Sequence, residues 1–179
     1  MNTAFDYVFL VLFLFVDLIV GVVIIYFIVK VFSSVFIKST QLEFLQENNL
    51  ASTILLVAIV ISTAMLCSNT IMTVHQNLHL AGRIPQESKA SFVLQTSALG
   101  LLQIILSVLI ALFIAFIATK LFDVLTKGLD EYGEMREKNN TAVGLLLAGI
   151  VIALTIYVSF PLSALVAVLI PLPQHVLPL

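Results

Sequence analysis

Four long stretches of this sequence are almost free of charge, and each is long enough to cross a lipid bilayer as a helix. A spanning helix needs about 20 predominantly apolar residues, and continuous apolar runs are typical of helices rather than of alternating barrel strands. The chain is 61% hydrophobic and 10% charged, whereas soluble domains are about 25% charged. The sequence therefore predicts an all-α, polytopic membrane protein that spans the lipid bilayer four times. The four stretches are residues 7–29, 50–74, 90–119 and 139–174.

The distribution of lysine and arginine predicts how these helices are oriented. The first and third connections together hold six of these residues, whereas the second connection holds only Arg83 and Lys89. Basic residues in short loops favour the cytoplasmic side, so the first and third connections are expected in the cytoplasm and both termini outside it. The net charge is −2 and no basic stripe is present, which argues against nucleic acid as a partner.

The chain also contains an internal repeat. A shift of 91 residues places QENNLAS (46–52) over EKNNTAV (137–143) and Glu43 over Glu134. Each copy is then a helix, a polar cytoplasmic linker and a second helix. Because each copy has two spans, the copies are parallel, and the expected product is a four-helix bundle whose helices extend into the cytoplasm. This divides the chain into a first repeat (1–74), an extracytoplasmic loop (75–92) and a second repeat with an apolar, proline-rich tail (93–179).

The second copy resembles a known family. The polar residues that follow its first span are similar to those of the domain of unknown function 350 family, small bacterial inner-membrane proteins built from two copies of a two-helix unit. That family's pattern is a Leu-(Phe/Leu)-Asp stretch, a pair of glutamates, and Gly-Asn-x-Ala-x-Ala at the start of an apolar helix. The matching residues are Phe122, Asp123, Glu134, Asn140 and Ala142.

The chain departs from this pattern at three positions of the second copy. Asn139 stands in place of the glycine, Met135 in place of the second acid, and Gly144 in place of the final alanine. In the first copy only Glu43, Asn49 and Ala51 fit. The resemblance implies a bacterial inner-membrane location and a link to envelope homeostasis, and it implies no enzymatic activity.

Asp17 is the only charged residue within the first apolar stretch, and it is the eleventh of that stretch's 23 residues. A charge near the bilayer centre costs about 2.5–3.5 kcal/mol on insertion scales. Asp17 is therefore expected to be neutral, paired or turned toward a wet interior. A proton or cation site is one interpretation, and the alternatives are a structural hydrogen bond between helices or a poorly buried acid that the span tolerates. The repeat breaks here, because the equivalent position in the second copy is Ser107 or Val108.

Paired asparagines precede the second helix of each copy. Asparagine is among the best N-cap residues, because its side chain accepts hydrogen bonds from free N–H groups of the first turn. Capping needs one asparagine at each site, so the second is free to bond across to the other copy. An anion such as a lipid phosphate at the helix N-termini is a further alternative. These residues are Asn48, Asn49, Asn139 and Asn140.

Other polar and small residues within the spans suggest helix contacts. Asn69, Gln103 and Ser107 are candidates for a polar network with Asp17. The Gly144-xxx-Ala148 and Gly149-xxx-Ala153 patterns allow close helix packing, either within the bundle or between copies of the chain. Pro161, within the last stretch, is expected to kink or end its helix.

The third connection carries an acidic cluster. It is interpreted either as a solvated helix face or as a docking surface for a cytoplasmic protein. His75 and His79 have helical i,i+4 spacing, but the stretch HQNLH lacks the glutamate of a zincin motif, so no metal site is predicted. The cluster consists of Asp130, Glu131, Glu134 and Glu137.

No nucleophile with a base, phosphate loop or metal cluster emerges from the sequence, so neither an enzyme nor a cofactor is predicted. The first functional hypothesis is a non-catalytic inner-membrane protein that scaffolds or senses envelope state through its cytoplasmic linkers. The alternative is a small channel or transporter for protons or cations, centred on Asp17. A homo-oligomer is expected, because a single four-helix bundle leaves little room for a pore.

Overall fold

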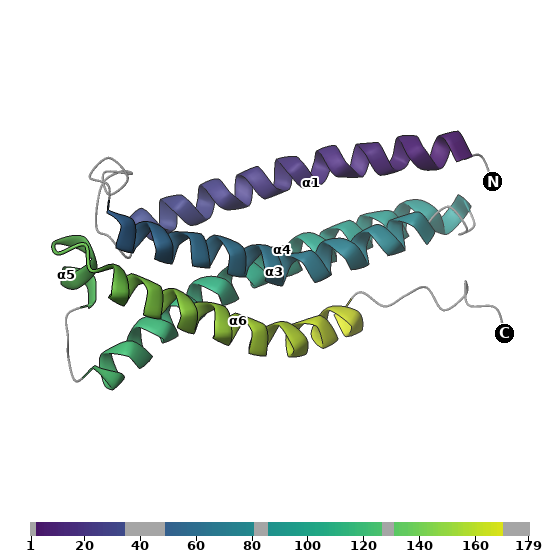
Figure 1. Ribbon diagram of the computed structural model, residues 1–179. Helices are drawn as coiled ribbons and strands as arrows, with labels where there is room; N and C mark the ends of the chain where they lie inside the picture. Colours follow the sequence, from purple (N-terminus) through teal and green to yellow (C-terminus); the bar gives the residue numbers. More distant parts are fainter. Residues whose placement is uncertain (1–2, 35–48, 81–85, 127–130, 170–179) are drawn as a thin grey trace.

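The computed structural model describes residues 3–34, 49–80, 86–126 and 131–169 (Figure 1). The described residues contain helices and no strand. Four of these helices are long and apolar enough to cross a membrane, namely α1, α3, α4 and α6. The predicted all-α membrane fold is thus confirmed, while the tandem repeat stays a prediction. The helices are α1 (Thr3–Phe32), α3 (Leu50–Leu80), α4 (Gln86–Leu125), α5 (Glu131–Arg136) and α6 (Thr141–Leu169).

Helix α3 is the centre of the bundle, and it contacts each of the other four helices. Helices α3 and α6 begin at the same end of the molecule and run in the same direction, whereas α4 returns antiparallel to α3 (Figure 1). The short helix α5 lies at the end where α3 and α6 begin.

Small side chains allow the three helices α3, α4 and α6 to approach closely. Ala111, Ala115 and Ala118 of α4 are fully or almost fully buried. They lie in the same core cluster as Leu55 and Ile59 of α3 and as two residues of α6. Lipid tails are as apolar as leucine, so helix association in a membrane depends on such close packing rather than on the hydrophobic effect. The two core residues of α6 are Leu147 and Val151.

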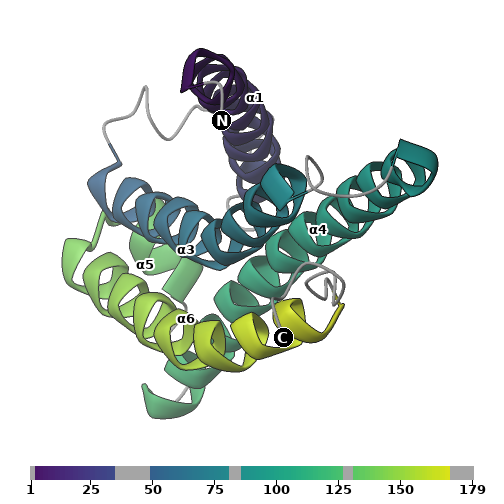
Figure 2. The ribbon, with the colours of Figure 1, turned by 90° about the vertical axis from the view of Figure 1, so that its right-hand side faces the viewer.

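Helix α1 stands apart from this three-helix core (Figure 2). Of its described side chains, from Val11 to Phe32, only those of Ile28 and Phe32 are buried. Both lie in the last two turns of the helix. The rest of α1 therefore presents apolar side chains to the surroundings on most of its surface, as expected for a helix that faces lipid.

Two sequence-based boundaries differ from the structure. Residues 75–80 continue α3 and residues 86–92 belong to α4, so the helices occupy most of the range assigned to an extracytoplasmic loop. Helix α6 does not end at Pro161, because it continues to Leu169. Proline removes one backbone N–H, but the helix tolerates this loss in an apolar segment where the remaining N–H groups are still best paired within the helix.

Candidate functional site: a membrane-embedded Asp–His pair

The side chain of Asp17 in α1 is paired with that of His75 in α3. The distance from Asp17 Oδ1 to His75 Nε2 is 3.2 Å, within hydrogen-bonding range, and the side chains are 35% and 29% exposed. Both residues lie in helices that can cross a membrane. A carboxylate in hydrocarbon is costly unless a partner shares its charge or proton, and His75 is such a partner.

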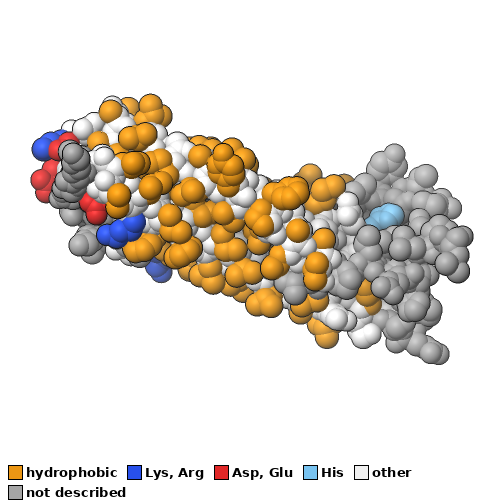
Figure 3. Space-filling model, turned by 90° about the horizontal axis from the view of Figure 1, so that it is seen from below, with side chains coloured by type: hydrophobic (Ala, Val, Ile, Leu, Met, Phe, Trp, Pro, Cys, Tyr) orange, Lys and Arg blue, Asp and Glu red, His pale blue; other side chains and the backbone are white. Residues whose placement is uncertain are grey.

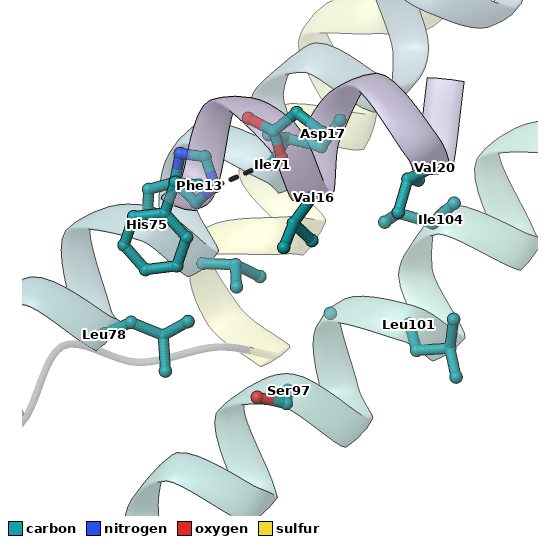
Figure 4. A pocket seen from close by; sticks show the side chains of 12 residues that line it. Phe13, Val16, Asp17, Val20, Ile71, His75, Leu78, Ser97, Leu101 and Ile104 are labelled. Atoms are coloured by element: carbon teal, nitrogen blue, oxygen red, sulfur yellow. Dashed lines mark ion pairs between the residues drawn. The ribbon is translucent and has the colours of Figure 1, made fainter. Parts of the chain in front are cut away.

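Phe13 holds the imidazole of His75 from the other side. The two rings are stacked, with centroids 4.3 Å apart and planes inclined by 26°. Phe13 precedes Asp17 by four residues, so one face of α1 supplies both the aromatic ring and the carboxylate (Figure 4). This arrangement fixes the imidazole plane while one ring nitrogen faces Asp17.

Two pockets meet at this pair. One, of about 200 Å³, lies between α1, α3 and α4 and is lined by Phe13, Asp17 and His75 together with residues such as Gly100 of α4 (Figure 4). The other, of about 540 Å³, lies between α1 and α3 and also contains Asp17 and His75 in its lining. Both pockets are otherwise mostly apolar. The ionisable pair is therefore the polar centre of the space that separates α1 from the core.

Asp17 could be singled out from the sequence, but its partner His75 was missed. The second span was expected to end at residue 74, which placed His75 in the extracytoplasmic loop, whereas α3 continues through His75 to Leu80. His79, one turn further along, is exposed. Among the described residues, no group of three His, Cys, Asp or Glu side chains could hold a metal ion.

The polar residues proposed to form a network with Asp17 have other surroundings. Asn69 donates a hydrogen bond to Ser163 Oγ of α6 at 3.0 Å. Ser107 donates to the carbonyl oxygen of Leu66 at 3.5 Å. Gln103 is buried, and its amide atoms have no partner among the described residues. Asn69 and Ser107 therefore connect α3 with α6 and α4, and within the described residues no hydrogen bond joins any of the three side chains to Asp17.

The paired asparagines bring the two polar linkers together. Asn49 Oδ1 accepts a hydrogen bond from the N–H of Ser52 at 3.0 Å, which caps α3. Asn49 Nδ2 also donates to the carbonyl oxygen of Met135 in α5 at 2.7 Å. The N–H of Ala51 donates to Asn139 Oδ1 at 3.1 Å. Two N–H groups of the first turn of α3 are thus satisfied by asparagines, one from each linker.

Asn139 and Asn140 contribute differently to the turn between α5 and α6, the first through its backbone conformation and the second through a side-chain hydrogen bond. Asn139 adopts a φ of 48°, a left-handed conformation that glycine and asparagine tolerate best. This explains physically why asparagine can replace the glycine of the family pattern. Asn140 Nδ2 donates to Glu134 Oε2 at 3.0 Å, which ties the start of α6 back to α5. Asn48 lies outside the described residues.

Of the acidic cluster, Glu134 is the best defined. Its carboxylate forms a salt bridge with Lys138 and accepts the hydrogen bond from Asn140. The hydrogen bond from Lys138, followed by that from Asn140, lowers the pKa of Glu134 below its ordinary value of 4.5. Glu137 is exposed. Asp130 lies outside the described residues, and the same holds for the side chain of Glu131.

The fold and the site define a class: a multi-pass helical membrane protein with an ionisable pair between its first helix and a three-helix core. Residues 94–172 match the family described as Domain of Unknown Function (DUF350). The match includes α4 from residue 94 onward, α5 and α6. This part of the chain is therefore similar to that family. No curated protein and no solved structure matches the chain.

Proposed function

We propose that this chain is a non-catalytic membrane protein that links proton or cation binding to movement of ions across the bilayer, with Asp17 and His75 as the ion-binding pair. The observation that carries this proposal is the 3.2 Å contact between Asp17 Oδ1 and His75 Nε2 within spanning helices. Ionisable residues in spanning segments commonly mark proton relays and ion pathways.

The chemistry of the pair supports proton binding. Histidine is the side chain whose charge changes most readily near neutral pH, and a neighbouring carboxylate can share its proton. When both groups are ionised, the pair is neutral overall. Gain or loss of one proton leaves a net charge in an apolar setting, which is unfavourable while α1 and α3 remain in contact. Proton binding is therefore coupled to the position of α1.

The packing of α1 supports the same proposal. Between the Phe13–His75 contact and the buried residues Ile28 and Phe32, α1 faces two pockets rather than a tight interface. A helix that touches the core at two places can shift when one contact changes charge. The pockets provide space in which a cation or water can reach the carboxylate.

Proton flux into proteoliposomes tests this function. The purified full-length protein is reconstituted with an internal pH-sensitive dye, and a potassium diffusion potential drives protons inward. We expect flux for the wild type and a loss of about tenfold or more for Asp17→Asn and for His75→Gln, since each removes one member of the proposed ion-binding pair. Repeating the assay with sodium or potassium gradients distinguishes protons from metal cations.

Matched variants control for the substitutions themselves. Asp123→Asn makes the same change near the end of α4, and His79→Gln makes it at an exposed position one turn after His75. Both are expected to retain wild-type flux. Equal flux in Asp17→Asn and Asp123→Asn, or no ion flux in the wild type, would refute the proposed function.

We also propose a bacterial inner-membrane location with both termini outside the cytoplasm. On the face shown in Figure 3, the charged side chains gather at the end of the molecule that carries α5. Lys30 lies in the last turn of α1, Lys120 near the end of α4 and Lys138 just after α5, whereas Lys89 lies near the start of α4. This distribution agrees with a cytoplasmic α5. A homo-oligomer is part of the same proposal, and mass measurement of the protein in lipid nanodiscs tests it.

The polar end also supports a second candidate function, scaffolding or sensing in envelope homeostasis through a cytoplasmic protein partner. Glu137 is exposed there, and the acidic side chains lie together at this end (Figure 3). Replacing Asp130, Glu131 and Glu137 by glutamine or asparagine should then reduce recovery of a partner after crosslinking in cells, while ion flux stays unchanged. Unchanged recovery would rule out this role for the cluster.

A further inference from the structure

The antiparallel helices α3 and α4 meet along a seam that carries polar side chains at matching levels. Val74 lies against Gly100, and the hydroxyl of Ser107 reaches the Leu66 carbonyl. These two contacts set the register between the helices. Thr70 is one turn from Val74 in the direction of Leu66. Gln103 is one turn from Gly100 in the direction of Ser107. Thr70 and Gln103 therefore lie at the same level.

The same register places a second polar pair nearer the turn between the helices. Asn77 is three residues beyond Val74, and Thr96 is four residues before Gly100, so these two side chains also share a level. All four residues are almost fully buried, with exposures of 0% for Thr70 and Asn77 and 3% for Thr96 and Gln103. The seam is therefore polar at two levels, one on each side of the Val74–Gly100 contact.

Several of these buried polar atoms lack a hydrogen-bond partner in the described part of the chain. They are Thr70 Oγ1, both side-chain amide atoms of Asn77 and both of Gln103. Other hydroxyls of the bundle bond back to their own helix, as Thr63 does to Ile59 and Thr155 does to Val151. An amide has a carbonyl and two N–H groups, so a single bond of this kind cannot satisfy it. In hydrocarbon, each unsatisfied group costs several kcal/mol.

We propose that the α3–α4 seam binds a short file of water molecules between the level of Asn77 and Thr96 and the level of Thr70 and Gln103. Buried waters typically make about three hydrogen bonds to otherwise unsatisfied polar groups. Neutral amides and hydroxyls, with no carboxylate among them, provide both donors and acceptors, which is the combination that water requires.

This file forms a hydrated inlet at one end of the seam between α3 and α4. Asn77 is three residues from the end of α3, so the file begins close to the turn that joins α3 and α4. From Asn77 to Thr70 the file spans seven residues of α3, or ~10 Å along the helix at 1.5 Å per residue. Leu66 lies one turn beyond Thr70, next to the inner end of the file. The file is therefore about a third as long as the ~30 Å hydrocarbon core is thick.

X-ray radiolysis of the wild-type protein in nanodiscs tests the inlet. Hydroxyl radicals formed from bound water oxidise the side chains that touch it, and mass spectrometry identifies them. Leu66 borders the seam, and Leu147 of α6 is a matched control, because both are leucines with 0% exposure. We expect Leu66 to be oxidised at least about tenfold faster than Leu147, since only Leu66 would neighbour bound water. Equal rates for the two leucines would overturn the inference.

A matched pair of variants tests the role of the amide. Gln103→Leu removes two of the groups that hold the water, so oxidation of Leu66 should fall toward the rate of Leu147. Gln95→Leu makes the same change at an exposed position of α4 and should leave the rate unchanged. If Gln103→Leu does not fold, the wild-type comparison decides alone. Persistent fast oxidation of Leu66 in a folded Gln103→Leu protein would show that this amide does not hold the water and would overturn the assignment.

This inference does not rest on the proposed ion-linked function. Radiolysis reports bound water whether or not Asp17 and His75 carry ions, and the flux assay reports ion movement whether or not the seam is hydrated. The two can therefore fail separately.

Discussion

Gly144 of α6 packs directly onto the backbone of Ala51 in α3. A Cβ atom placed on Gly144 would lie 2.5 Å from the Ala51 carbonyl oxygen and 2.8 Å from its Cα. Side chains can rotate away from such a contact, but a helical backbone cannot. The two helices therefore cross this closely only because Gly144 has no side chain, and this crossing lies beside the Asn49–Met135 and Ala51–Asn139 hydrogen bonds.

Gly144→Ala should destabilise the bundle. The added methyl group must push α6 away from α3, and such overpacking costs about 1–3 kcal/mol. Gly149→Ala is the matched control, because no atom lies within 4 Å of a Cβ at that position and alanine is favoured over glycine in helices by up to about 1 kcal/mol. Thermal unfolding in detergent should show a lower midpoint for Gly144→Ala only. Equal midpoints would contradict the close crossing.

Asn49 is expected to stabilise the linker region through two separate hydrogen bonds. Asn49→Ala loses both the cap of α3 and the bond to Met135, at a cost of about 1–3 kcal/mol. Asn49→Asp keeps an oxygen that can accept the bond from Ser52 but cannot donate to Met135. Its thermal midpoint should therefore lie between those of wild type and Asn49→Ala. If both variants melt alike, the bond to Met135 contributes all of the stabilisation.

The Asp17–His75 contact should appear as an energetic coupling. A double-mutant cycle with Asp17→Ala, His75→Ala and the double variant isolates the pair from the separate effects of each change. Hydrogen bonds between membrane helices average about 0.6 kcal/mol in such cycles, so we expect a coupling of that order in the unfolding of the detergent-solubilised protein. A coupling of zero would mean that the two side chains act independently.

The Glu134–Lys138 pair should make stability depend on pH at both ends of the range. Hydrogen bonding lowers the pKa of Glu134 from 4.5, so its contribution is complete above that value and is lost as the pH falls through the lower, folded pKa. The pKa of Lys138 is raised from 10.5, chiefly by its hydrogen bond to Glu134. Its contribution is complete below 10.5 and is lost at higher pH.

Thermal midpoints measured from about pH 3 to about pH 11 check this dependence, because this range brackets the two ordinary pKa values. Glu134→Gln should flatten both ends of the profile, whereas Glu137→Gln, at a neighbouring exposed residue, should leave it unchanged. The pair lies at the surface, so added salt should weaken the effect. A wild-type profile that Glu134→Gln leaves intact would assign the pH dependence to other groups.

Much of the fold could be predicted from the sequence, because the signals are local. Length and apolarity define the four spans. Asparagines mark where α3 and α6 begin, and a carboxylate in the middle of a span is unusual in any membrane protein. Asp17 and Asn49 could both be singled out in this way. The Gly144-xxx-Ala148 pattern likewise predicted close helix packing.

The contacts between helices could not be predicted, because they depend on how each helix is rotated. The patterns at Gly144 and Gly149 look alike in the sequence, yet Gly144 is buried against α3 and Gly149 is exposed. The helices are apolar on all sides, so periodicity does not indicate which face turns inward. The pairing of Asp17 with His75 was missed for another reason, because the second span was expected to end at residue 74 and His75 was placed in a loop. One signal was available: HQNLH follows an apolar stretch without a helix-breaking residue, so the helix could continue through His75.

The small buried surface of α1 has a thermodynamic consequence. Because lipid replaces protein around most of this helix at little cost, its docked and undocked arrangements differ by the energy of a few contacts. A change of about 1.4 kcal/mol shifts the ratio of two such populations tenfold. Loss of the Asp17–His75 contact or of the packing at Ile28 and Phe32 is therefore enough to redistribute α1 between the two arrangements.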